Sequence, residues 1–99
     1  MEIVDVNEVA GAQVRKVYDH PQGQALLVAL NPGETLRRHT APVDIFIYVL
    51  EGEGVVRIGE EEAQVRADLL LPCAAGVPHA LENTGDGVLR ALVVKLGSS

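Results

Sequence analysis

The sequence predicts an all-β domain of short strands arranged as a double sheet or barrel, and three observations support this fold class. Apolar residues make up 47% of the 99 residues, while aromatic residues make up 3% and tryptophan is absent, so branched aliphatic side chains must form the core. Fifteen valines are spread along the chain, and valine fits a pleated, half-buried strand better than a helix. Turn residues recur about every 8–12 positions, and no stretch of about twelve residues has helical apolar spacing. We therefore expect residues 1–99 to form a single all-β domain.

Turn-forming residues divide the chain into eight predicted strands. Taken in order, these strands cover residues 14–18, 24–30, 44–50, 55–58, 63–65, 69–71, 79–82 and 88–96. The first two are separated by a Pro-Gln-Gly turn, and an Asn-Pro-Gly turn follows the second. His39 comes after that turn and is expected to open a strand, as His79 does after Val77-Pro78.

Two segments have the composition of hairpins. Residues 55–65 consist of an alternating strand up to Gly59, the acidic run 60–62 and a returning strand. Gly59 favours the turn between the strands because glycine adopts positive φ at little cost. Residues 82–88 contain Gly85 and Gly87 among short polar side chains, which favours a tight connection into the last strand.

The charge balance excludes several classes of partner. Eight basic residues stand against fourteen acidic ones, a formal charge of −6, so neither nucleic acid nor an anionic membrane is an expected partner. No apolar run approaches the ~20 residues of a membrane span, and the N-terminus lacks a basic signal-peptide start. We expect a cytoplasmic location. The lone Cys73 cannot form an internal disulfide, so no cross-link within the chain is expected to stabilise the small core. We therefore expect a homodimer that buries further apolar surface.

The three histidines differ in their sequence surroundings. His39 and His79 each follow glycine and proline residues that favour a rigid loop and a defined imidazole direction. His20 precedes Pro21 within a polar cluster, which predicts an exposed turn. His39 and His79 are therefore the candidate site residues.

The spacing around these two histidines resembles the motifs of the cupin family. Gly33, five residues and His39 match the opening of the first cupin motif, and residues 48–54 resemble the strand and glycine turn at its close. Gly76, two residues, His79, three residues and Asn83 match the second half of the second motif. The resemblance implies a double-stranded β-helix, or jelly-roll barrel, with ligand-bearing positions at His39 and His79.

Other positions of the family pattern are changed. The second histidine of the first motif falls on Ala41 and its glutamate on Ile45, so two of the four usual metal ligands are replaced. In the second motif the first glycine falls on Asp68, which tolerates the left-handed conformation, and the proline falls on Ala74.

A divalent transition metal (Fe, Mn, Zn or Ni) needs a further donor beside His39 and His79. Asp44 is the candidate third ligand, with a role in a turn or at the strand start as the alternative. Cys73 is either a soft donor or a small buried hydrophobe. Without metal, the imidazoles would bind water or a ligand and could transfer protons. Tyr48, Arg37 and Arg38 could add contacts at the barrel mouth.

Alternation along residues 45–50 separates two faces of one strand. Ile45, Ile47 and Val49 are expected to line an apolar cavity with a polar mouth, suited to a small, largely carbon molecule. Phe46 and Tyr48 face the other way, toward the second sheet or a partner subunit, and Phe46 is predicted at a dimer contact. Three functions remain open: a metal-dependent enzyme of unidentified catalytic residues, a metal-free binding protein for a small molecule, and a structural homodimer without catalytic activity.

Overall fold

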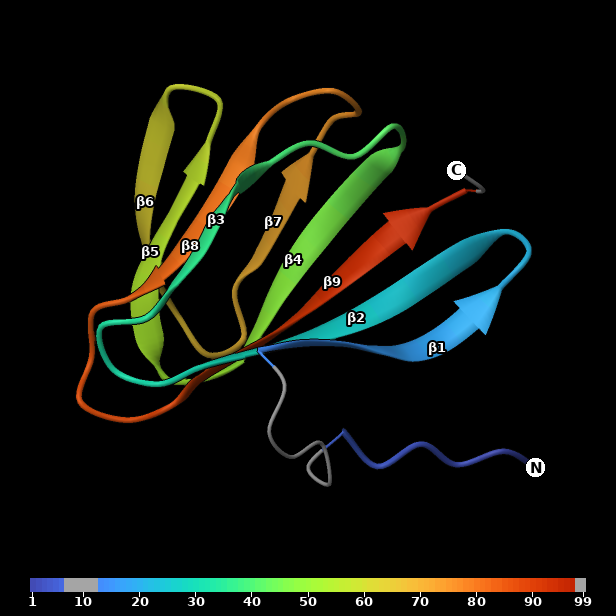
Figure 1. Ribbon diagram of the computed structural model, residues 1–99, viewed down its shortest axis with the longest axis horizontal. Coiled ribbons are helices and arrows are strands. Elements are labelled where there is room, and N and C mark those ends of the chain that lie inside the picture. The colour runs from blue at the N-terminus through green and yellow to red at the C-terminus, as the bar shows by residue number, and fades with distance from the viewer. Residues whose placement is uncertain (7–12, 98–99) are drawn as a thin grey trace.

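The computed structural model describes residues 1–6 and 13–97, which contain nine β-strands (Figure 1). Their bounds are β1 Val14–His20, β2 Gly23–Leu30, β3 Thr35–His39, β4 Asp44–Glu51, β5 Glu53–Ile58, β6 Glu61–Arg66, β7 Leu70–Cys73, β8 His79–Asn83 and β9 Leu89–Leu96. Within this part of the chain, no helix is long and apolar enough to cross a membrane.

The strands form two antiparallel sheets. A five-stranded sheet has the order β1-β2-β9-β4-β7, and a four-stranded sheet has the order β3-β8-β5-β6 (Figure 1). The chain passes repeatedly from one sheet to the other, as in a jelly roll, which confirms the predicted fold class. All eight predicted strands are present, with ends that differ by one or two residues.

One strand, β3, was not predicted, and the placement of His39 was wrong as a result. His39 is the last residue of β3, whereas His79 is the first residue of β8, as predicted. The sequence shows no clear apolar alternation for β3, because the strand is mostly exposed. Its register with β8 also shifts between Leu36 and His39, where Arg37 and Arg38 lie.

The two predicted hairpins have different outcomes. β5 and β6 form the first, with Gly59 at φ +61°. The second prediction was wrong as a hairpin, since β8 and β9 belong to different sheets and residues 84–88 cross between them. Asn83 holds this crossing: its Nδ2 donates to the carbonyls of Leu30 and Gly87 at 2.9 and 2.8 Å, and its Oδ1 accepts the Gly85 N–H.

Aliphatic side chains fill the space between the sheets. Ile45, Ile47 and Val49 of β4 face inward, are at most 2% exposed, and pack in one cluster with Val56 and Leu81 of the other sheet. Their inward orientation was predicted, but they fill the core rather than line an open cavity. Burying each such side chain contributes about 1.5–3 kcal/mol to folding.

Candidate functional site

His39 and His79 meet at one end of the four-stranded sheet. They are register partners on β3 and β8, and their Nε2 atoms lie 3.0 Å apart. The two rings are 4.2 Å apart between centroids and inclined at 67°. Residues forty positions apart in the sequence are thus brought together as a pair.

A backbone carbonyl orients the His39 ring. Its Nδ1 lies 2.9 Å from the carbonyl oxygen of Arg37, within the irregular part of β3. A carbonyl oxygen can only accept, so Nδ1 carries the proton and Nε2 is left as the unprotonated nitrogen of the neutral ring.

The turn before β8 orients the His79 ring in the same way. His79 is only 3% exposed, and its Nδ1 lies 3.3 Å from the Val77 carbonyl oxygen. Gly76 shapes this turn with φ +78° and donates its N–H to the Ala41 carbonyl at 2.9 Å. Nδ1 of His79 also lies 3.7 Å from Sγ of Cys73.

The two Nε2 atoms face each other at hydrogen-bond distance. Across 3.0 Å, one ring can donate an Nε2–H to the unprotonated Nε2 of the other, or both rings can present a lone pair to one shared cation. The Arg37 and Val77 carbonyls favour the tautomers whose Nε2 is unprotonated, while the Cys73 thiol can donate to Nδ1 of His79 in its other tautomer. The position between the rings therefore suits one proton or one cation.

The electrostatic surroundings of His79 oppose a second proton on the pair. Burial lowers the pKa of its imidazole from the ordinary value of 6.5, and electrostatic repulsion by His39, when that ring is protonated, and by Lys95 lowers it further, while the hydrogen bond that Nδ1 donates to the Val77 carbonyl raises it. His79 is accordingly neutral near pH 7, which is the form that binds metal ions.

The donor set fits a transition metal in part. Two nitrogens 3.0 Å apart match neighbouring ligands on one octahedral cation with bonds of about 2.1 Å. Imidazole nitrogen suits Zn, Fe and Ni. Ala41 and Ile45, at the positions of the missing ligands, are apolar and buried. Within residues 1–6 and 13–97, no group of three His, Cys, Asp or Glu side chains is arranged to hold a metal ion.

Asp44 and Cys73 make other contacts. Asp44 Oδ1 accepts the Ala75 N–H at 2.8 Å, so its carboxylate holds the turn that follows β7. Cys73 is buried, its Sγ lies 3.4 Å from the Val77 carbonyl oxygen, and burial together with the Asp44 charge raises the pKa of its thiol.

The remaining residues predicted at the mouth lie elsewhere or contribute only their backbone. Tyr48 is on the outer face of β4, where its hydroxyl donates to Asp68 at 2.7 Å and its pKa is raised by that bond. Asp68 has φ +73°, which confirms that aspartate replaces glycine there. Arg38 lines a hollow of about 210 Å³ with Arg57 on the outer face of the four-stranded sheet. His20 is exposed, as predicted.

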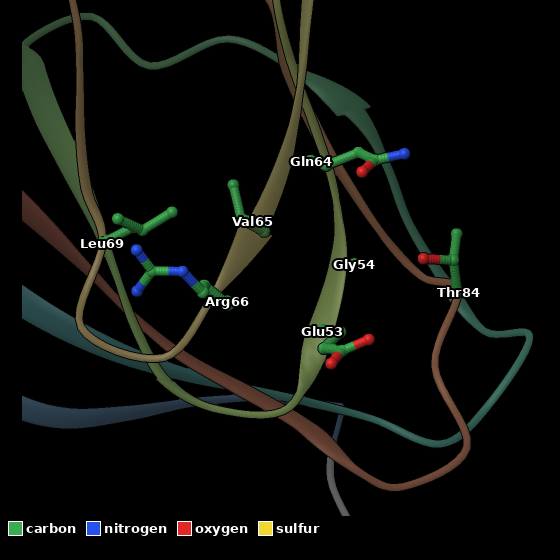
Figure 2. A pocket seen from close by; sticks show the side chains of 7 residues that line it. All are labelled: Glu53, Gly54, Gln64, Val65, Arg66, Leu69 and Thr84. Atoms are coloured by element: carbon green, nitrogen blue, oxygen red, sulfur yellow. The ribbon is translucent and has the colours of Figure 1, made fainter.

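A larger hollow lies at the opposite end of the four-stranded sheet. It has a volume of about 420 Å³, and Figure 2 shows the side chains that line it: Glu53, Gly54, Gln64, Val65, Arg66, Leu69 and Thr84. Gly54 pairs with Asn83, whereas His79 pairs with Ile58 at the other end of the same strands. This hollow is therefore separate from the histidine pair.

Sequence reasoning missed one charged residue near the pair. Lys95 follows Ala91 and Val93 on the inward face of β9 and lies opposite Ile45 of β4. The sequence carries the signal, since the apolar alternation at residues 89, 91 and 93 ends in a lysine.

Fold and site together define a small jelly-roll protein with a histidine pair at one end of its four-stranded sheet. The chain belongs to the cupin family, because the model of the Cupin domain matches residues 26–95.

Two further comparisons give similar proteins. The tetracenomycin polyketide synthase protein TcmJ of Streptomyces glaucescens is 37% identical over 66 residues, which span 66% of this chain and 44% of TcmJ. The chain thus covers less than half of that relative's length. A Thermus thermophilus crystal structure is 33% identical over the full length of both chains, with a TM-score of 0.87.

A more distant structure shows the fold alone. The DMSP lyase DddQ of Ruegeria pomeroyi superposes with a TM-score of 0.75 at 21% identity, over 85% of this chain and 46% of that one.

Proposed function

We propose that this cupin binds one divalent transition metal ion through Nε2 of His39 and Nε2 of His79, and that the metal's remaining positions accept a small organic molecule. The observation that carries the proposal is the 3.0 Å approach of two nitrogens whose rings are both held by carbonyls through Nδ1. Such outer contacts fix a histidine's orientation and direct its free nitrogen at a metal.

The metal would supply Lewis acidity, and the chain's own groups would orient it. Fe, Mn, Zn and Ni are the ions considered, because two imidazoles do not distinguish among them. Asp44 is retained as the proposed third ligand, although it would have to release the Ala75 N–H to reach the metal. Water is the alternative donor.

The test is metal content and affinity in matched histidine variants. Wild-type protein should take up about one equivalent of Zn²⁺ or Co²⁺. His39→Ala or His79→Ala removes a ligand, so it should weaken binding by more than the roughly 10- to 100-fold that follows the loss of an outer contact of a ligand. His20→Ala removes an exposed histidine and is the control. Equal metal uptake by the wild type and the double variant His39→Ala/His79→Ala would refute the proposal.

A second candidate function is a metal-free binding protein. One proton shared between the two Nε2 atoms also satisfies the pair, and a small acid could supply that proton. In that case, small acids should raise the melting temperature in the presence of a chelator. Metal ions added without a chelator should leave the melting temperature unchanged.

We also propose a homodimer formed by the outer face of the five-stranded sheet. Apolar side chains follow one another across this face, from Tyr18 on β1 through Val94 and Phe46 to Pro72 on β7. Tyr18, Leu70 and Leu96 are 46–52% exposed there. The area of this surface suits a second copy of the chain. Five strands about 4.8 Å apart present a face on the order of 500 Å² in projection. The accessible area of its side chains exceeds this projection and comes near the ~800 Å² per partner of stable interfaces.

The oligomeric state tests this surface directly. Sedimentation should give twice the chain mass of 10.5 kDa, and Phe46→Glu should convert the dimer to a monomer. Val55→Glu, on the outer face of the four-stranded sheet, is the matched control. A wild type that sediments as a monomer at all concentrations would refute the dimer.

For location we propose the cytoplasm. The buried, unpaired Cys73 thiol suits a reducing compartment. Cell fractionation followed by immunoblotting tests this.

A further inference from the structure

The hollow of about 420 Å³, at the end of the four-stranded sheet away from the histidine pair, has an acidic and a basic residue in its lining. These residues, Glu53 and Arg66, are directly opposed on β5 and β6, so they share one face of the sheet. Val65, next to Arg66, is 4% exposed and packs in the core. Because side chains alternate along a strand, Glu53 and Arg66 project from the outer face.

The two charges line the hollow without neutralising each other. Among residues 1–6 and 13–97, the Glu53 carboxylate makes no hydrogen bond or ion pair, and the Arg66 side chain has one contact, from Nη1 to the Ala67 carbonyl at 3.3 Å. In Figure 2 the Arg66 guanidinium is turned toward Leu69, while the Glu53 carboxylate is turned the other way, toward the side of Thr84. The hollow thus has a positive side and a negative side.

A second pair on the same two strands shows what this register allows. Arg57 and Glu62 are also directly opposed on β5 and β6, and they form an ion pair with 2.8 Å between Nε and Oε1. The same pairing of strands therefore permits a closed ion pair. At Glu53 and Arg66 the pair is open, which leaves both charges available to a ligand.

Neutral polar and apolar side chains complete the lining. The Gln64 amide and the Thr84 hydroxyl lie on the Glu53 side in Figure 2, and neither makes a side-chain hydrogen bond within the described residues. Leu69 is partly buried against the core and adds apolar surface on the Arg66 side. A volume of about 420 Å³ lies within the range of small-molecule pockets, which combine apolar walls with a few polar groups.

We propose that this hollow binds a small zwitterion, a free α-amino acid with an aliphatic side chain. Its carboxylate pairs with the Arg66 guanidinium, its ammonium donates to the Glu53 carboxylate and the Thr84 hydroxyl, and its side chain packs on Leu69. A simple anion would be repelled by Glu53, and a simple cation would be repelled by Arg66. Only a molecule that carries both charges gains from both sides. The hollow is separate from the histidine pair, so this inference does not depend on the metal.

The experiment is a titration of ¹⁵N-labelled protein, followed by NMR, with L-leucine and with two analogues that each lack one charge. 4-Methylpentanoate lacks the ammonium group, and 3-methylbutylamine lacks the carboxylate. Leucine should shift the amide signals of Gly54 and Thr84 and should bind at least about threefold more tightly than either analogue. The signals of His39 and His79 should not move. A chelator is present throughout, so the outcome is independent of metal binding.

Variants of the two charged residues test their separate roles. Arg66→Gln and Glu53→Gln should each weaken leucine binding about three- to tenfold. Arg66→Gln should no longer prefer leucine to the amine, and Glu53→Gln should no longer prefer leucine to the carboxylate. Arg15→Gln on β1 and Glu60→Gln in the β5–β6 turn remove exposed charges elsewhere and should match wild type. Unchanged signals outside the hollow show that each variant is folded.

Several results would overturn the proposal. If leucine leaves the signals around the hollow unmoved up to its solubility limit, there is no amino-acid site here. If 4-methylpentanoate or 3-methylbutylamine binds as tightly as leucine, the hollow takes simple anions or simple cations and the zwitterion is wrong. If both glutamine variants bind leucine as wild type does, Glu53 and Arg66 are not its partners.

Discussion

Strand β8 has a buried polar residue at each end, and the two ends behave differently. Asn83 is 1% exposed, and backbone groups satisfy both its Nδ2 and its Oδ1. His79 is 3% exposed, but only its Nδ1 faces a carbonyl, while its Nε2 faces another nitrogen. A buried group with all its bonds to the backbone supports the fold, whereas a buried nitrogen that faces another nitrogen can hold a proton or a cation between them.

The largest expected effect is on the structural end. Asn83→Ala would leave the Leu30 and Gly87 carbonyls and the Gly85 N–H without their partner. We expect a loss of about 3 kcal/mol or more in the free energy of unfolding, since each buried unsatisfied group costs about 1–3 kcal/mol. Urea unfolding measures this loss. A change below about 1 kcal/mol would contradict the structural role of Asn83.

The functional end should show the reverse pattern. His39→Ala removes an exposed ring and one of two facing lone pairs, so we expect a stability change within about 1 kcal/mol. The same variant should lose metal binding, measured by Zn²⁺ titration. A variant that is strongly destabilised yet binds zinc normally would reverse our assignment of the two ends.

The pH dependence of stability should report His79. Because burial lowers its folded-state pKa below 6.5, the unfolded chain binds more protons once the pH falls below that value. The His79 contribution is therefore fully present above about pH 7 and is lost as the pH falls through 6.5 toward the lower folded-state pKa. Urea midpoints at pH 7.5 and 5.5 should differ less in His79→Gln than in wild type. His20→Gln, at an exposed histidine, should retain the wild-type difference.

The last prediction concerns the reactivity of the Cys73 thiol and needs no variant. Burial raises the pKa of its thiol, which keeps it protonated and shielded. Iodoacetamide at pH 8 should label the native protein far more slowly than the protein in urea. Equal rates would show that this edge of the site opens freely.

Much of the fold was predictable because it depends on short-range patterns. Alternation at Ile45, Ile47 and Val49 gives the inner face directly, and the left-handed Asp68 and the turn glycine Gly76 are marked by residue type. Strand β3 was missed because it is exposed and irregular, so its side chains carry little apolar signal.

The site was predictable in its two histidines but not in its surroundings. Spacing indicated His39 and His79, whereas the direction of the Asp44 carboxylate depends on the Ala75 N–H that packing brings to it. Lys95 enters the region only through sheet pairing, since its neighbours Ile45 and Gln24 are distant in sequence.

The central claim is that Nε2 of both histidines is unprotonated and available to one cation. Long-range ¹H–¹⁵N NMR of the imidazoles tests it most directly. We expect His39 and His79, with one equivalent of Zn²⁺, both to show a protonated Nδ1 and a shifted, unprotonated Nε2, while His20 does not change. A protonated Nε2 on either residue of the pair after zinc addition would contradict the account.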